Sequence, residues 1–130
     1  MKKSTSKRTA TSTTLAKELA ATIADNFGEQ VVILDVRQLT SYADFLVVAT
    51  ARNPPLARSL ADQLGVLGRS LGSPLFASEG ESTCEWLLLD FVDVIVHLFL
   101  PEVRSYFDFE SLWRDAPRLV FPERPHADSA

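Results

Sequence analysis

CEWLLLDFVDVIVHLFLPEVRSYFDFESLW, residues 84–113, carries the strongest structural pattern in the chain. Two apolar runs, residues 86–89 and 94–99, flank a turn at residues 90–93. Aromatic, leucine and β-branched side chains dominate both runs, which predicts an antiparallel β-hairpin. Because apolar residues are almost continuous along each run, we expect the hairpin to be covered on both faces or to lie in the middle of a sheet.

Two further apolar patterns predict helices. Leu15, Leu19 and Ile23 recur at every fourth residue and predict a helix that ends near Gly28. Asn53 precedes two prolines and is suited to cap a second helix. The core-facing stripe of that helix is expected to consist of Leu56, Leu60, Leu64, Leu67 and Leu71.

Short apolar segments between these helices predict strands. Residues 31–34 and 45–49 read as buried strands, and residues 75–77 as a further short one. Short helical turns are expected over residues 102–114. The order of elements predicts an α/β fold with a mixed β-sheet flanked by helices.

A chain of 130 residues is the size of one domain. We expect residues 1–13, which are basic and rich in hydroxyls, to form a disordered tail, with a weak organellar transit peptide as the alternative. Residues 14–118 are expected to form the domain, and residues 119–130 a flexible tail. The sequence predicts no membrane partner, because no apolar run approaches the roughly 18 residues of a membrane span.

Charge is distributed unevenly along the chain. The whole chain has a net charge of −4, but residues 75–115 contain nine acidic residues against two arginines, a net charge of −7. Such a surface repels a phosphate backbone, so we expect no direct nucleic-acid readout and favour a basic protein partner. An acidic surface that serves only solubility is the alternative.

The residues suggest little catalytic chemistry. Asp90 and Asp93 could hold Mg²⁺, but turn aspartates more often bond their own backbone. His97 lies in an apolar run and is expected to bond a neighbour in the core. Cys84 is followed by the acidic Glu85 and has no cationic neighbour in sequence, so we do not expect it to act as a nucleophile. Because no phosphate-binding glycine loop is present, the sequence predicts no catalytic residue, cofactor or metal site.

Aromatic residues gather in the acidic part of the chain. Aromatics with an acidic rim suit an interface with a basic protein, although they could also cap the core. We expect a mixture, with Trp86 partly exposed and Leu112 and Trp113 partly packed. The aromatic residues concerned are Trp86, Tyr106, Phe107, Phe109 and Trp113.

These motifs resemble those of the ribosomal silencing factor family, RsfS, also called Iojap. The resemblance covers roughly residues 15–118 and is most specific around the hairpin. The matching residues are Glu79-Gly80, Trp86, Asp90, residues 93–97 (DVIVH), Arg104 and residues 110–113 (ESLW), with a weaker match at residues 34–36, Ser41, Asp44, Thr50 and Ala61-Asp62.

The resemblance implies a nucleotidyltransferase-like fold without transferase activity. It implies a translational repressor that binds the large ribosomal subunit through its ribosomal protein number fourteen, blocks subunit joining and forms a homodimer when free. A cytoplasmic location is expected, with an organellar matrix as the alternative. The predicted partner-binding residues are Trp86, Asp90, Asp93, His97, Phe107, Leu112 and Trp113.

The chain departs from the usual family pattern at several positions. Ala43 replaces a threonine, Ala51, Asn53 and Leu56 replace glycine, serine and histidine, and Phe107 replaces a tyrosine. If that tyrosine hydroxyl contacts the partner, the contact is shifted or lost here. A metal-dependent nucleotidyltransferase and a dimeric adaptor unrelated to ribosomes are the alternative functions.

Overall fold

The computed structural model describes the backbone of residues 5–121 and the side chains of residues 12–121. Within this part of the chain, six strands form one mixed sheet in the order β3-β4-β5-β2-β1-β6. β2 and β5 are parallel, whereas the other neighbouring strands are antiparallel. The predicted α/β class with a mixed sheet is therefore confirmed, while the narrower nucleotidyltransferase-like label stays a prediction.

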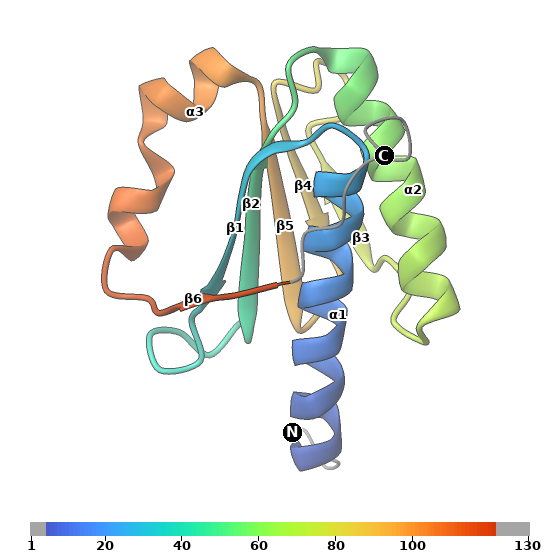
Figure 1. Cartoon of the computed structure of the whole chain (residues 1–130), viewed down its shortest axis with the longest axis vertical. Coiled ribbons are helices and arrows are strands. Elements are labelled where there is room, and N and C mark those ends of the chain that lie inside the picture. Colours follow the sequence, from blue (N-terminus) through green and yellow to red (C-terminus); the bar gives the residue numbers. More distant parts are fainter. Residues whose placement is uncertain (1–4, 122–130) are drawn as a thin grey trace, which may run out of the picture.

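Helices α1 (Thr5–Asp25) and α2 (Pro54–Ser70) cover one face of the sheet, as Figure 1 shows. The predicted stripe of α1 is confirmed, because Leu15, Leu19 and Ile23 are all buried. In α2, Leu60 and Leu64 are fully buried, and Leu56 and Leu67 pack at the edge of the same cluster. Leu71 differs from the prediction, because it lies at the C-terminal cap and is exposed.

The predicted hairpin lies in the sheet interior. It consists of β4 (Trp86–Asp90) and β5 (Val94–Phe99), and every residue of β5 is buried. β5 runs beside β2 (Phe45–Thr50), which is also buried throughout. Next to β2 lies β1 (Glu29–Asp35), so the four central strands follow the apolar runs of the sequence.

Two short helices lie on the other face of the sheet. They are α3 (Pro101–Phe107) and the 3-10 helix η1 (Phe109–Trp113), and Asp108 joins them in the left-handed conformation with a φ of 49°. We call residues 101–113 the flap (Figure 1). Its inner side chains, including Val103, Phe109 and Trp113, pack on Leu46, Val48 and Ile95 of the sheet.

The structure differs from the predicted boundaries at both ends. α1 begins at Thr5, so most of the predicted disordered tail is helical, and residues 1–4 lie outside the described residues. Ser12, inside that predicted tail, is buried and its hydroxyl donates to Asp44 Oδ2 at 2.9 Å. Once its packed half is formed, a helix extends at little further cost, which accounts for the early start.

The two edge strands of the sheet, β3 and β6, differ from the prediction. β3 (Ala77–Glu79) lies two residues beyond the predicted strand, because its position follows its pairing with Leu88–Asp90 of β4. β6 (Arg118–Leu119) was not predicted, and it pairs with Ile33 and Leu34 of β1. Leu119 and Phe121 pack against the core, so the domain extends past residue 118, and residues 122–130 of the predicted tail lie outside the described part.

Candidate protein-docking surface

Five rings form a cluster between the flap and the sheet. Trp86 lies at its centre, with ring-centroid distances of 4.8 Å to Phe99, 5.2 Å to Phe107 and 5.9 Å to Phe109. His97 lies under the same cluster, 4.5 Å from the Phe109 ring. The cluster therefore ties strands β4 and β5 to the flap.

His97 holds the indole ring of Trp86 in place through a hydrogen bond. The indole Nε1–H of Trp86 donates to Nδ1 of His97 at 3.0 Å. Because an indole only donates, Nδ1 must be the unprotonated nitrogen and the imidazole must be neutral. Burial lowers the pKa of His97 to about 4, which agrees with this state. The expectation of a core histidine bonded to a neighbour is confirmed.

The outer part of this cluster is open to solvent. Phe107 is 52% exposed and its neighbour Tyr106 is 83% exposed, while Trp86 and Leu88 of β4 are half-buried. A hollow of about 320 Å³ beside Trp86 is lined by Glu79, Gly80 and Leu88. A protein partner could insert a side chain here, next to the carboxylate of Glu79.

η1 continues this surface toward the other end of the sheet. Leu112 is 76% exposed, whereas Trp113 is half-buried and its ring lies 6.5 Å from Tyr42. Nε1 of Trp113 is buried without a hydrogen-bond partner among the described residues. The expectation that this pair is partly packed holds for Trp113 and not for Leu112, because Leu112 lies on the outer side of the 3-10 turn.

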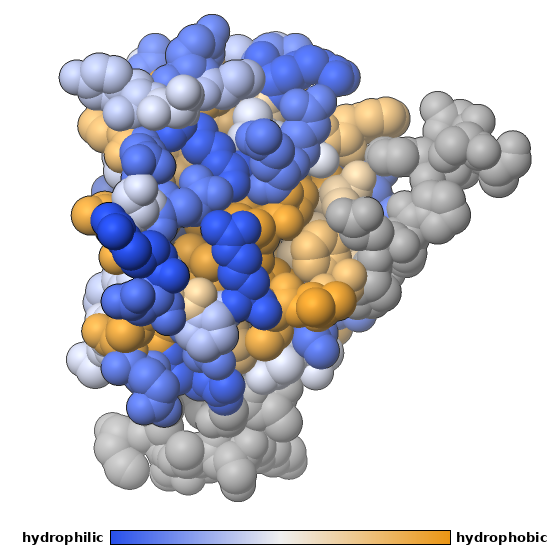
Figure 2. Space-filling model, turned by 60° about the vertical axis from the view of Figure 1, so that its left-hand side comes forward, coloured by the Kyte–Doolittle hydropathy of each residue, from blue (hydrophilic) through white to orange (hydrophobic). Residues whose placement is uncertain are grey.

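We define the docking surface as Trp86, Leu88, Tyr106, Phe107, Leu112 and Trp113. Four carboxylates lie on the same elements: Glu79 and Asp90 extend from the same side of the sheet as Leu88, and Glu102 and Asp108 lie on the flap. In Figure 2, which brings the α3 side of the molecule forward, hydrophobic and hydrophilic side chains are interleaved on this side. Aromatic residues mixed with charges of one sign are typical of an interface with an oppositely charged protein.

Asp90 and Asp93 lie at the hairpin turn, at the opposite end of β4 from Trp86. Asp90 Oδ1 accepts a hydrogen bond from the Val92 backbone N–H at 2.7 Å, which confirms the turn interpretation for Asp90. The backbone carbonyl of Asp93 accepts from the Asp44 N–H at 2.8 Å. Among the residues that the structure describes, no three His, Cys, Asp or Glu side chains are placed to hold a metal ion.

The structure brings only some of the predicted partner-binding residues together. Trp86, His97 and Phe107 share one cluster and Leu112 and Trp113 the adjoining helix, whereas the two aspartates lie apart at the turn. Leu88 and Tyr106 belong to the docking surface but were not among the predicted partner-binding residues. The alternation of β4 carried the signal for Leu88, because it lies two residues after Trp86 and therefore on the same face.

The fold and the docking surface together define the class of protein: an α/β domain with one aromatic face that has carboxylates nearby. Residues 9–130 match the family profile described as ribosomal silencing factor during starvation. The chain therefore belongs to the ribosomal silencing factor family. No helix in the described part of the chain combines the length and the hydrophobicity that crossing a membrane requires.

Individual relatives agree with this assignment. Ribosomal silencing factor RsfS of Chromobacterium violaceum is 35% identical over 99 residues, which cover 76% of this chain and 81% of that protein. Protein Iojap, chloroplastic, of Arabidopsis thaliana is 30% identical over 116 residues, which cover 87% of this chain and 47% of that protein. A crystal structure of a protein from Chromobacterium violaceum matches with a TM-score of 0.71 at 33% identity, covering 88% of both chains.

Proposed function

We propose that this protein represses translation by binding the large ribosomal subunit through its basic ribosomal protein number fourteen. The bound domain occupies the surface that the small subunit must approach, and it blocks subunit joining by its bulk alone. It transforms no substrate. Membership of the silencing factor family and the character of the docking surface both support this proposal.

The observation that carries the proposal is the exposure of Phe107 beside Trp86. Phe107 adjoins both the exposed Tyr106 and the half-buried Trp86, and adjoining apolar side chains at the surface are typical of a protein-binding site. The carboxylates of Glu79, opposite Leu88 on the neighbouring strand, and of Glu102, on α3, suit the lysines and arginines of a ribosomal protein. Trp86, Phe107, Leu112 and Trp113 would contact the partner directly, with Asp90 and Asp93 at one end and His97 supporting Trp86.

Sedimentation of purified protein with separated large subunits on sucrose gradients tests the proposal. Phe107→Ala should weaken binding by about 30-fold, because truncation of an aromatic anchor at an interface costs about 2 kcal/mol. Trp113→Ala and Asp90→Lys should also reduce co-sedimentation. Val66→Ala is the matched control, since Val66 is 59% exposed on α2 and lies on the opposite side of the sheet.

Two outcomes would overturn the assignment. If all three variants sediment like the wild type, the docking surface lies elsewhere. If the wild type itself does not sediment with large subunits, or binds without reducing formation of whole ribosomes, the repressor mechanism fails. Loss of binding in Val66→Ala would show that the effects report general destabilisation.

The resemblance also carries proposals on assembly and location. We propose that the free protein is a homodimer, which light scattering during gel filtration tests. We place it in the cytoplasm or, as the name of the plant relative suggests for an organellar form, in an organellar matrix. Fractionation of cells that express the protein at its natural level distinguishes the two compartments.

A further inference from the structure

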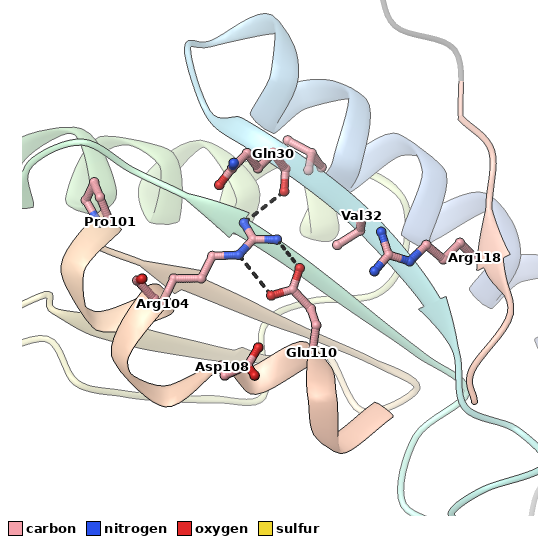
Figure 3. A pocket seen from close by; sticks show the side chains of 9 residues that line it. Gln30, Val32, Pro101, Arg104, Asp108, Glu110 and Arg118 are labelled. Carbon is pink, nitrogen blue, oxygen red and sulfur yellow. Dashed lines mark hydrogen bonds and ion pairs between the residues drawn. The ribbon is translucent and has the colours of Figure 1, made fainter. Parts of the chain in front are cut away.

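Arg104 is the polar residue that joins the flap to the sheet. Its side chain leaves α3 and is 9% exposed, and Figure 3 shows the guanidinium between Gln30 and Glu110. Nη1 donates to the backbone carbonyl of Gln30 at 2.8 Å and to Thr50 Oγ1 at 2.9 Å. Arg104 thereby connects α3 to both β1 and β2.

The other side of the same guanidinium binds a carboxylate of η1. Nε and Nη2 of Arg104 donate to the two carboxylate oxygens of Glu110 at 3.1 and 2.5 Å. This paired contact fixes the direction as well as the distance of the carboxylate. The hydrogen bonds from Arg104 lower the pKa of Glu110, so the carboxylate is ionised at neutral pH.

The flap needs such a contact because its helices are short. α3 spans seven residues and η1 five, and the cap residue of α3, Leu100, provides no side-chain hydrogen bond. Helices of this length are not stable alone, so tertiary contacts determine their position. Between them, Asp108 breaks the helical path, and the pair of Arg104 and Glu110 spans this break.

We propose that Arg104 is a positioning residue for docking: its guanidinium sets the angle between α3, which bears Phe107, and η1, which bears Leu112 and Trp113. This inference rests on the proposed function and extends it. A cavity of about 580 Å³ adjoins Arg104 between the flap and β1, so the flap has room to move when this contact is lost. Lysine cannot replace it, because one ammonium cannot reach four acceptors in a planar arrangement.

The first measurement needs no partner. Amide hydrogen exchange reports flap opening at Arg104, Asp108 and Ser111, whose N–H groups bond within the flap or to Leu100. In Arg104→Lys these amides should exchange at least about tenfold faster, while the amides of β2 and β5 keep their rates. Thr50→Val, which removes one of the four hydrogen bonds, should give a smaller increase at the same amides.

The second measurement is the affinity for large ribosomal subunits. Arg104→Lys should bind about tenfold more weakly, because only a fraction of the molecules then has the flap in the docking position, and the apparent affinity falls by that fraction. Arg37→Lys is the matched control: Arg37 also pairs through two nitrogens with a carboxylate, that of Asp35, but lies on an exposed loop outside the flap. It should leave both measurements unchanged.

The outcomes separate this inference from the proposed function. Equal acceleration of flap and sheet amides in Arg104→Lys would overturn positioning and indicate general destabilisation only. Faster flap exchange with unchanged affinity would overturn the role in docking. If the wild type does not bind large subunits, the proposed function fails, and unchanged flap exchange in Arg104→Lys and Thr50→Val would separately overturn the positioning of the flap.

Discussion

The imidazole of His97 is buried, neutral and bonded to the indole of Trp86, and this makes stability depend on pH. Burial lowers the folded pKa to about 4, whereas the unfolded value is near 6.5. Between these values only the unfolded chain binds the proton, so the free energy of unfolding falls as pH decreases. The full shift corresponds to ~3 kcal/mol, lost progressively from about pH 6.5 to pH 4.

Urea unfolding at pH 7.0 and pH 5.0 measures this effect. His97→Gln removes the titrating group, so the loss of stability between these two pH values should be smaller than in the wild type. Carboxylates titrate in both proteins and cancel in the comparison. An identical loss in both proteins would contradict the assignment of the pH dependence to His97.

Gly80 lies against the backbone of the docking tryptophan. Its φ is 93°, and a Cβ there would meet the carbonyl oxygen of Trp86 at 2.1 Å. Gly80→Ala should therefore lower the free energy of unfolding by more than the roughly 1–2 kcal/mol of a left-handed alanine alone. Gly72→Ala is the control, because Gly72 has a φ of 79° and no atom within 4 Å of the added Cβ. Thermal unfolding measures both variants. If Gly80→Ala and Gly72→Ala lowered the free energy of unfolding equally, the clash with Trp86 would not contribute.

Single residues were predictable where their chemistry is local. The turn role of Asp90 follows from its position between two apolar runs, and the structure has its carboxylate on the Val92 N–H. The role of Arg104 could not be predicted from local sequence, because Gln30 and Thr50, which accept its hydrogen bonds, lie 74 and 54 residues away in the chain. Such distances leave no spacing in the sequence from which the contact could be inferred.

At the level of elements, the start of α2 depends on one side chain. Asn53 is in the extended conformation, and its Oδ1 accepts from the Leu56 backbone N–H at 2.9 Å. Asn53→Ala should lower the free energy of unfolding by about 1 kcal/mol, while Asn53→Ser or Asn53→Asp should restore most of it. Urea unfolding measures all three, and equal loss in the three variants would exclude capping as the cause.

Long apolar elements were predictable, and short edge elements were not. β4, β5 and β2 coincide with apolar runs because buried central strands must be apolar on both faces. β6 comprises two residues, too few for any periodicity, and it exists because β1 offers Ile33 and Leu34 at its free edge. The extension of α1 into hydroxyl-rich sequence likewise depends on a tertiary contact, between Ser12 and Asp44.

At the scale of the whole molecule, the two faces of the sheet differ in their cover. α1 and α2 cover one face (Figure 1). On the other face, beside the flap, Trp86 and Leu88 are only half-buried. The acidic segment, residues 75–115, contributes β3, β4, β5, the flap and the loops between them, so its net charge of −7 lies in this part of the molecule. The sequence predicted this coincidence of charge and aromatic residues, but which rings are exposed depends on the angle of the flap.

That charge distribution predicts salt-dependent binding to a basic partner. The association rate with large subunits should fall as ionic strength rises, because screening shortens the reach of the acidic face. Glu102→Lys, on the flap, should lower the association rate at low salt more than the dissociation rate rises. Stopped-flow fluorescence of the tryptophans at two salt concentrations measures both rates.

Asp62→Lys tests whether the association rate depends on where a charge lies or only on the net charge of the protein. Asp62 is exposed on α2, on the far side of the sheet, and its reversal changes the net charge by as much as that of Glu102. If the local field of the docking surface steers the partner, Asp62→Lys should slow association much less than Glu102→Lys. Equal slowing by both variants would mean that only the net charge of −4 matters, and the acidic rim would then have no special role in docking.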